Sequence, residues 1–221
     1  MKVDLRFKPS FCTLFVTLLA GESILAESDA MASMSARTRI RPRWNGGFFR
    51  AILRKIFGRE SLFINEISCP AEIESVQVVL TQPTPGDLLQ FELDGNSLYL
   101  QPGAFVACTP GVKLGMGWAG LASWFGGEGL FRLQVSGHGT VWLGAYGAIF
   151  DREVRGEYIV DTGHLVAYEP TISLSVGLSA GIFSSFFGGE GFVSRVRGHG
   201  RIFLQTRSIE ELATWTNHYL R

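Results

Sequence analysis

Histidine and cysteine side chains are the groups of this sequence best suited to bind a metal ion. His138 and His199 each lie between two glycines in equivalent turns, and Cys69 lies near the corresponding place earlier in the chain. A metal site built from these three side chains can be imagined. It would require three equivalent turns to converge, whereas such turns normally point apart. We therefore expect no metal site and no cofactor.

The other chemical motifs favour a protein without catalytic activity. The run Gly126-Gly-Glu-Gly resembles a phosphate-binding loop, but it contains no lysine and leads into an apolar strand pattern. Glutamates recur at Glu60, Glu128 and Glu190, where accepting hydrogen bonds from turn amides suits them better than catalysis. No pair of carboxylates is singled out by the sequence. We expect a non-enzymatic protein, and we identify no small-molecule substrate.

A cationic segment stands out in a chain whose formal charge is zero. Residues 37–59 contain eight of the 20 Lys and Arg residues and no acidic residue. The rest of the chain therefore has 12 basic against 20 acidic residues, a balance of −8. This asymmetry favours an anionic partner, and a solvated basic loop is the alternative.

Within this segment, residues 46–57 place apolar side chains on one helical face and basic side chains on the other. A basic amphipathic helix of this kind can lie in the interface of an anionic membrane. The weaker alternative is RNA binding, with Trp44 and Phe48 available to stack on bases. The predicted contact residues are Arg41, Arg43, Trp44, Phe48, Phe49, Arg50, Leu53, Arg54, Lys55 and Ile56.

Two later segments, residues 119–125 and 181–187, correspond in position to this helix and are apolar but uncharged. Three equivalent apolar loops could lie together at one end of the fold. They could equally pack on the core or form an oligomer interface. A homo-oligomer is the expected assembly.

These segments belong to a unit that occurs three times along the chain, with boundaries near residues 9–85, 86–150 and 151–207. Each copy opens with a glycine turn and an apolar strand, as at Gly21, Gly95 and Gly156. Its second half carries a Gly-Gly-Glu-Gly element, which is degraded in the first copy. We expect this element to need positive φ, a conformation that glycine tolerates. The structural turn residues of the later two copies are Gly127, Glu128, Gly129, Gly189, Glu190 and Gly191.

Period-two apolar patterns, such as Phe131-Arg-Leu-Gln-Val, predict half-buried antiparallel strands. We therefore expect an all-β fold, an antiparallel β-sandwich or double-stranded β-helix with the three repeats in pseudo-threefold arrangement. Residues 1–207 would form this single domain, and residues 208–221 a C-terminal helix. In that helix Ser208 is the N-cap and Glu211 completes a capping box. We expect the helix to dock on the sheet, with partner binding as the alternative.

The N-terminal run 11–20 resembles a short signal peptide, because it is apolar and follows basic residues. Asp4 and Pro9 interrupt that pattern, and the repeat makes the run a strand. The odd number of cysteines, with no CxxC pair, indicates a reducing compartment rather than a disulfide framework. We expect a cytoplasmic protein of bacterial type that can associate with a membrane.

Several motifs together resemble the mitochondrial biogenesis family named for altered inheritance of mitochondria, protein twenty-four. They are Gly21-Glu-Ser-Ile, Pro85-Gly-Asp, Leu100-Gln-Pro-Gly-Ala-Phe, Gly127-Glu-Gly, Ala145-Tyr-Gly-Ala, Val160-Asp-Thr-Gly-His-Leu-Val-Ala and Leu204-Gln-Thr-Arg-Ser. The resemblance covers nearly the whole chain. It implies a β-sandwich akin to the tryptophan RNA-binding attenuator protein, whose subunits form rings, and it implies no established reaction. The turn Glu27-Ser-Asp-Ala-Met departs from the Pro-Gly-Ala-Met of that family.

Overall fold

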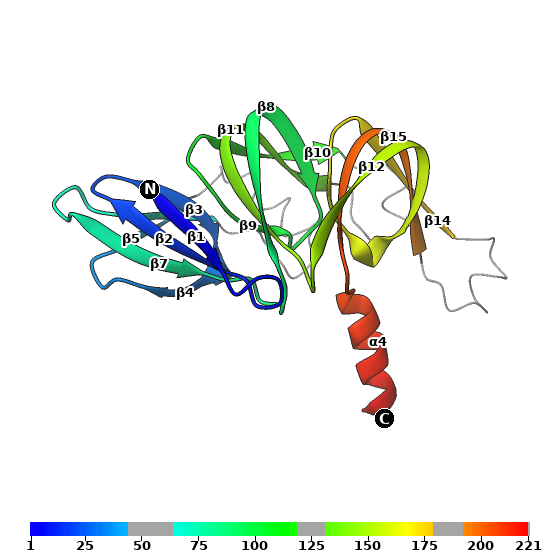
Figure 1. Ribbon diagram of the computed structural model, residues 1–221, viewed down its shortest axis with the longest axis horizontal. Coiled ribbons are helices and arrows are strands. Elements are labelled where there is room, and N and C mark those ends of the chain that lie inside the picture. Colours follow the sequence, from blue (N-terminus) through cyan, green and yellow to red (C-terminus); the bar gives the residue numbers. More distant parts are fainter. Residues whose placement is uncertain (44–63, 119–130, 179–191, 221) are drawn as a thin grey trace.

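The computed structural model describes residues 1–43, 64–118, 131–178 and 192–220, and these residues are predominantly β structure (Figure 1). The strands are β1 (Lys2–Arg6), β2 (Thr13–Leu19), β3 (Ser23–Glu27), β4 (Met31–Met34), β5 (Arg39–Arg43), β6 (Ile64–Ser68), β7 (Ser75–Leu80), β8 (Leu88–Leu100), β9 (Phe105–Cys108), β10 (Val112–Trp118), β11 (Phe131–Gly144), β12 (Ile149–Asp161), β13 (Leu165–Tyr168), β14 (Ile172–Leu178) and β15 (Phe192–Gln205). Two short 3-10 turns, Ser28–Ala30 and Thr162–His164, and the helix α4 (Ile209–Tyr219) complete the described elements. The predicted mostly-β fold with a C-terminal helix is confirmed.

The strands form two sheets, and every pair of neighbouring strands is antiparallel. The smaller sheet has the order β1-β2-β7-β4. The larger follows β12-β15-β13-β8-β11-β9-β3-β6-β5, with β10 added on β11 and β14 added on β15. The β5 strand, which carries part of the predicted cationic segment, therefore lies at one edge of the larger sheet.

Two stretches of the larger sheet, residues 88–144 and 149–205, use the same pairing scheme. In the first, β11 pairs with β8 along its length and also with β9 and β10. In the second, β15 pairs with β12, β13 and β14 in the same way. The β8–β11 register shifts between Ser136 and His138, where Gly137 has a φ of +104° that favours glycine.

The N-terminal apolar run forms β2, as its position in the repeat predicted. Leu14, Val16 and Leu18 are buried, while the residues between them are half-exposed. This period of two is the pattern of a strand with one face on the core. The buried face of β2 shares a core cluster with Ile24 of β3 and Ile67 of β6, so strands of the larger sheet cover it.

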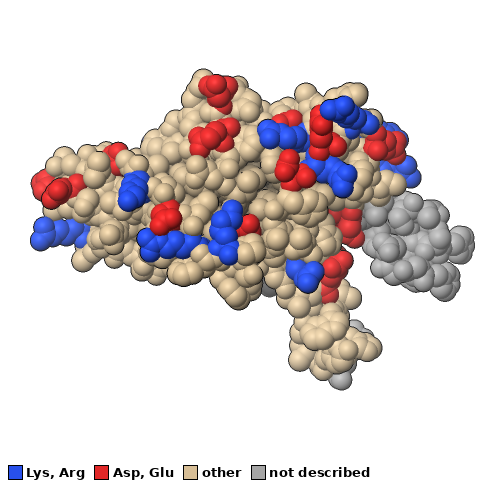
Figure 2. All heavy atoms as spheres, in the orientation of Figure 1, with Lys and Arg blue, Asp and Glu red and all other residues tan. Residues whose placement is uncertain are grey.

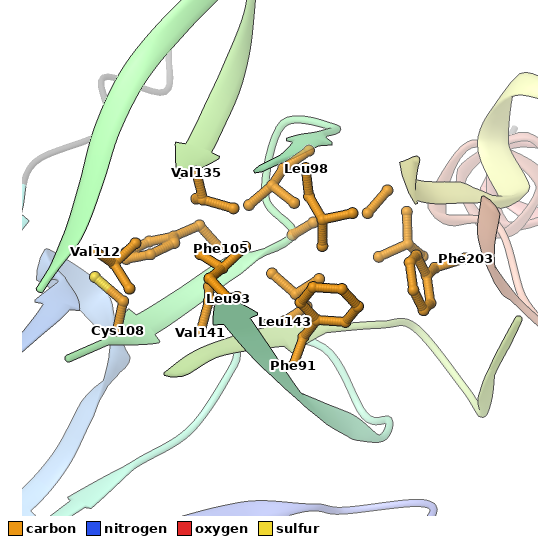
Figure 3. Packing of buried hydrophobic residues seen from close by; sticks show 14 of the residues in the cluster. Phe91, Leu93, Leu98, Phe105, Cys108, Val112, Val135, Val141, Leu143 and Phe203 are labelled. Atoms are coloured by element: carbon orange, nitrogen blue, oxygen red, sulfur yellow. The ribbon is translucent and has the colours of Figure 1, made fainter. Parts of the chain in front are cut away.

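The core of the larger sheet is packed with aromatic and branched side chains (Figure 3). Phe91 of β8 meets Phe203 of β15 edge to face, with 5.6 Å between ring centroids. This contact joins the two stretches that share a pairing scheme, and edge-to-face packing of this kind stabilises aromatic pairs beyond their area burial.

The alternating apolar pattern of β11 predicts the wrong environment for one residue. It predicts that Arg132 points to solvent, yet this side chain is 2% exposed. Its guanidinium donates a hydrogen bond to the Tyr168 hydroxyl and lies 5.2 Å from the centre of that ring. Tyr168 of β13, a strand that β8 separates from β11 in the sheet order, thus supplies an aromatic and polar partner that the pattern of β11 alone does not reveal.

The C-terminal helix begins at the predicted cap but does not dock on the sheet. The Ser208 hydroxyl accepts a hydrogen bond from the Glu211 amide at 3.4 Å, which confirms the N-cap. The Glu211 carboxylate, expected to close a capping box, lies 3.5 Å from His164 Nε2. The helix projects away from both sheets (Figure 1), and none of its residues is buried. The expectation of docking was wrong because periodicity defines an apolar face without defining its cover.

Candidate functional site

The strand β5 holds the part of the predicted cationic surface that the structure describes. Arg39 lies 2.6 Å from a carboxylate oxygen of Glu72, and Arg43 lies 3.5 Å from one of Glu66. These exposed pairs reduce the positive field of the strand but contribute little stability. Arg41 is exposed, and within the described ranges no acidic side chain pairs with it.

The other predicted contact residues lie outside the described residues. They are Trp44, Phe48, Phe49, Arg50, Leu53, Arg54, Lys55 and Ile56. The predicted structural turn residues also lie outside them: Gly127, Glu128, Gly129, Gly189, Glu190 and Gly191. The grouping of the three apolar loops at one end of the fold therefore stays a prediction.

The helix α4 presents an apolar face to solvent. Ile209, Leu212, Trp215 and Tyr219 recur at helical spacing and are between 45% and 67% exposed. The Trp215 and Tyr219 rings lie 4.9 Å apart, so they form a contiguous aromatic surface. In Figure 2 the projecting helix is largely free of charged side chains beyond its base. An isolated helix of this length is marginal in water, so this face is suited to a partner.

The first turn of α4 is fixed to the body by His164. The His164 Nδ1 atom lies 2.8 Å from the Gln205 carbonyl oxygen, and the Nε2 atom lies 3.5 Å from the Glu211 carboxylate. The Ser208 cap is buried. These contacts set the direction in which α4 leaves the sheet, so its apolar face is presented from a defined base.

A pocket of about 490 Å³ opens beside the base of this helix. Its walls come from segments that are far apart in the sequence: residues 27–29, 82–84, 101–104, 144–146, 165–166, Gln205 and Ile209. Glu27 and Asp29 supply carboxylates, and no Lys, Arg or His lines the pocket among the described residues. Among the described lining residues, the charged ones are therefore Glu27 and Asp29.

Three glutamines line the pocket, and the backbone engages two of them. The Gln82 Nε2 atom donates to the Ala145 carbonyl oxygen at 2.8 Å. Gln205 accepts from the Tyr146 amide and donates to the Gly163 carbonyl oxygen, both at 2.8 Å. The Nε2 atom of Gln101 is buried without a hydrogen-bond partner. Leaving such a donor unsatisfied costs about 1–3 kcal/mol.

The histidines and Cys69 do not come together as a metal site. His138 is exposed and lies 3.7 Å from an Asp94 carboxylate oxygen. Cys69 is buried, with its Sγ atom 3.3 Å from the Ile73 carbonyl oxygen. Within the described ranges no three His, Cys, Asp or Glu side chains are grouped so that they could hold a metal ion.

Burial also opposes thiol chemistry. Cys12, Cys69 and Cys108 are all buried free thiols. Desolvation raises the pKa of Cys108 to about 12, and burial also raises the pKa of Cys12. Because the thiolate is the nucleophile, these two side chains are unsuited to nucleophilic catalysis at neutral pH.

The sequence favours a protein without a Gly-x-Ser-x-Gly nucleophile motif, but that is wrong at the level of sequence, because residues 177–181 have this pattern. In hydrolases this motif places a serine on a sharp turn between a strand and a helix. Here Gly177 and Leu178 end β14, which is antiparallel to β15, and Ser179 lies outside the described residues. The strand context differs from the parallel sheet in which that motif works.

The pocket and its glutamines were not predicted from the sequence. A signal was present, because Leu100-Gln101 and Leu204-Gln205 repeat a leucine–glutamine pair at the ends of strands. The membrane prediction rested instead on residues 46–57. No helix in the described part of the chain is long and apolar enough to cross a membrane.

Comparison with known proteins gives consistent results. The family model described as mitochondrial biogenesis AIM24 matches residues 5–207. The chain is 27% identical to the uncharacterised protein M6_Spy0233 of Streptococcus pyogenes serotype M6, over 100% of this chain and 91% of that protein. It is also similar to the crystal structure of protein SPYM3_0169 from Streptococcus pyogenes, with a TM-score of 0.79, 25% identity and 99% of each chain covered.

Proposed function

Since the chain belongs to the mitochondrial biogenesis AIM24 family, we propose that it is a non-enzymatic assembly protein that forms homo-oligomers. The exposed apolar face of α4 carries this proposal. A protein that presents an amphipathic helix with an exposed apolar face can associate with other copies by burying that face. The same proposal includes two finer features of the fold. These are three repeats in pseudo-threefold arrangement and a fold similar to that of the tryptophan RNA-binding attenuator protein. The shared pairing scheme of residues 88–144 and 149–205 supports them.

Light scattering on the purified full chain tests the assembly. The wild type should form a discrete oligomer at micromolar concentration, and Leu212→Ser with Trp215→Ser should shift it toward the protomer. Because both side chains are exposed, the double variant should keep the circular dichroism and melting temperature of the β body. The matched control is Thr214→Ser with Asn217→Ser on the other side of the helix. A wild-type chain that is monomeric at these concentrations would contradict the proposal.

We place a peripheral membrane contact in the cationic segment, residues 37–59. The support is its sequence, in which basic and apolar residues alternate with helical spacing. Leu53→Ser with Ile56→Ser should abolish binding to anionic liposomes while leaving the fold intact. If this variant unfolds, the two residues belong to the core and the membrane contact is wrong. The three buried thiols suit a reducing compartment such as the cytoplasm.

RNA binding is the second candidate, supported by the exposed Arg41 on an edge strand, which pairs with no acidic side chain of the described residues. Arg41→Ala with Arg43→Ala should weaken binding to a labelled oligonucleotide, and the affinity should fall steeply with salt. Leu53→Ser with Ile56→Ser should leave this binding nearly unchanged, in contrast to liposome binding. Salt-insensitive binding would exclude this function.

A further inference from the structure

We propose that copies of this chain pair head to tail, with the end of β12 in one copy hydrogen-bonded along β4 of the next. The inference rests on the proposed homo-oligomer and names a contact surface for it that is separate from α4. Two strand junctions inside the chain carry the inference, because the exposed edges of β12 and β4 match the two sides of those junctions.

The larger sheet contains the same short junction twice. Each time, the end of one strand forms a two-residue antiparallel ladder with a four-residue strand further along the chain. The pairs are Leu25↔Cys108 and Ala26↔Ala107 between β3 and β9, and Tyr99↔Tyr168 and Leu100↔Ala167 between β8 and β13. Leu25 and Cys108 are at most 3% exposed, and the rings of the two tyrosines lie 5.3 Å apart. Both junctions therefore bring side chains into close packing.

The strand β4 is paired in the same way as β9 and β13, but no described strand lies on its other side. In all three strands the register shifts after the first residue, and the residues skipped are Ala32, Val106 and Val166. Met34, two places further on, therefore corresponds to Cys108 and Tyr168. Those two residues are at most 5% exposed at their junctions, whereas Met34 is 39% exposed.

The end of β12 corresponds to the end of β8. Tyr99 pairs with the residue four places before His138, and Ile159 pairs with the residue four places before His199. Ile159 is therefore the counterpart of Tyr99, and of Leu25 at the other junction. Leu25 is buried there, whereas Ile159 is 50% exposed and β12 is the edge of the larger sheet.

These two edges also lack the residues that usually prevent edge strands from pairing. Charged side chains and proline protect such strands in natural proteins. The edge strand β1 has three charged residues, and the edge strand β5 has three arginines and Pro42. By contrast, β4 has the sequence Met-Ala-Ser-Met, and residues 158–160 of β12 are Tyr-Ile-Val. Both edges are therefore open to a further strand.

A second copy is needed to bring these edges together, because Figure 1 shows β4 toward one end of the molecule and β12 toward the other. The register of the internal junctions then sets Ile159 against Met34 and Val160 against Ser33. This places the two exposed apolar side chains in one cross-strand pair. Because the two sides of the contact differ, each copy keeps a free edge for a further copy, and the chain of copies closes into a ring where the rotation allows it.

Cross-linking of single-cysteine variants of the full chain tests the register. Directly opposed cross-strand residues have Cβ atoms about 5 Å apart, which is close enough for a disulfide. Ile159→Cys mixed with Met34→Cys should therefore give a linked dimer with oxidised glutathione, whereas Ile159→Cys mixed with Phe11→Cys, at another exposed position, should not. The three native thiols are buried and should not compete. Equal yields with both partners, or Ile159→Cys linked to itself, would overturn the head-to-tail register.

Charge substitutions test whether the contact holds the copies together. Ile159→Lys and Met34→Glu should each weaken association about tenfold or more in analytical ultracentrifugation, because each places a single charge in the pair. Mixing the two variants should restore association, since the introduced charges are opposite and face each other. Phe150→Lys, at a residue of β12 that is 46% exposed and lies outside the expected register, is the matched control and should associate as the wild type does.

The outcomes separate this inference from the proposed function. A monomeric wild-type chain would overturn both. A wild-type oligomer that Leu212→Ser with Trp215→Ser dissociates, but that neither Ile159→Lys nor Met34→Glu weakens, would overturn the strand pairing alone. Because Ile159 and Met34 are exposed in the single chain, their variants should keep the circular dichroism of the wild type.

Discussion

The strand β2 and the helix α4 are both amphipathic in sequence, yet the structure treats their apolar faces in opposite ways. Leu14, Val16 and Leu18 of β2 are at most 2% exposed. Leu212 and Trp215 of α4 are 45% and 62% exposed. Hydrophobic periodicity therefore identifies which side chains share a face, and the surrounding topology decides whether anything covers it.

The topology explains the difference. The strand β2 pairs with β1 and β7, and the sheet they form packs on residues of β3 and β6. After β15 the helix α4 projects away from the sheets, and His164 fixes its first turn (Figure 1). The apolar face of β2 is thus covered within one chain, whereas the described residues leave the face of α4 exposed.

The largest expected effect is on the free energy of unfolding, when a tryptophan is replaced by alanine once at a buried position and once at an exposed position. Trp142 is 1% exposed, and its Nε1 atom donates to the Gln90 side chain at 3.2 Å. Trp142→Ala should lower the free energy of unfolding by about 3–5 kcal/mol, because it removes a large buried side chain and leaves a cavity. Trp215→Ala should change it by less than about 0.5 kcal/mol. Urea unfolding followed by circular dichroism, at low protein concentration, measures both.

Equal destabilisation by the two tryptophan variants would contradict this comparison. It would show that α4 packs on the body in solution. A selective loss of oligomer in Trp215→Ala, with an unchanged urea midpoint at low concentration, would sharpen it, because the helix face would then be covered only in the assembly.

A thiol placed in each environment should also behave differently. Burial raises the pKa of Cys108 to about 12 from an ordinary value of 9.0, which lowers its thiolate fraction at neutral pH about a thousandfold. Iodoacetamide should therefore label the native chain very slowly and the urea-unfolded chain quickly. A cysteine introduced on α4 by Asn217→Cys should react at the rate of a free thiol. Rapid alkylation of native Cys108, located by mass spectrometry, would contradict the buried environment.

The same shift has a consequence for stability at alkaline pH. Because the native pKa is raised, the contribution of Cys108 is fully present below the pKa of the unfolded thiol. It should be lost progressively as the pH rises from about 9 toward 12, where the unfolded chain releases its proton more readily. Cys108→Ala should flatten this part of the profile.

A smaller and local effect is expected at the cap of α4. Ser208→Ala removes the hydroxyl that accepts from the Glu211 amide and should destabilise the helix by about 1 kcal/mol. The core clusters do not include α4, so the urea midpoint of the β body should not change. Hydrogen exchange of the α4 amides measures the local change, and Asn217→Ala, at an exposed position away from the cap, is the control. A lower urea midpoint in Ser208→Ala would show that the helix and the body unfold together.

Local patterns in the sequence predict local structure well. Alternation predicts β2 and β11, and Ser208 predicts the first residue of the helix, because strand pleat and helix caps depend on neighbouring residues. The burial of Arg132 depends on β13, which approaches from another part of the sheet. The pocket depends on turns near Asp29, Gln101 and Tyr146 that meet only in the folded chain. Such long-range contacts leave little trace in any single stretch of sequence.

The smallest effect is expected on the exposed face of β12 and β15, where polar side chains face solvent without a cover. The Glu157 carboxylate accepts from Arg197 Nε at 3.0 Å and from Arg195 Nη1 at 2.9 Å. These hydrogen bonds, first that from Arg197, hold the pKa of Glu157 below its usual value of 4.5. Since the native pKa is lowered, the stabilisation is present at neutral pH and is lost as the pH falls through that lowered pKa. Glu157→Gln should therefore lower the urea midpoint slightly at pH 7 and leave it unchanged at pH 2, with Glu153→Gln as the control for a contact between residues on one strand. Salt should reduce the difference at pH 7, as for exposed ion pairs. A loss as large as that of Trp142→Ala would mean that this face is covered, as β2 is, rather than open to water.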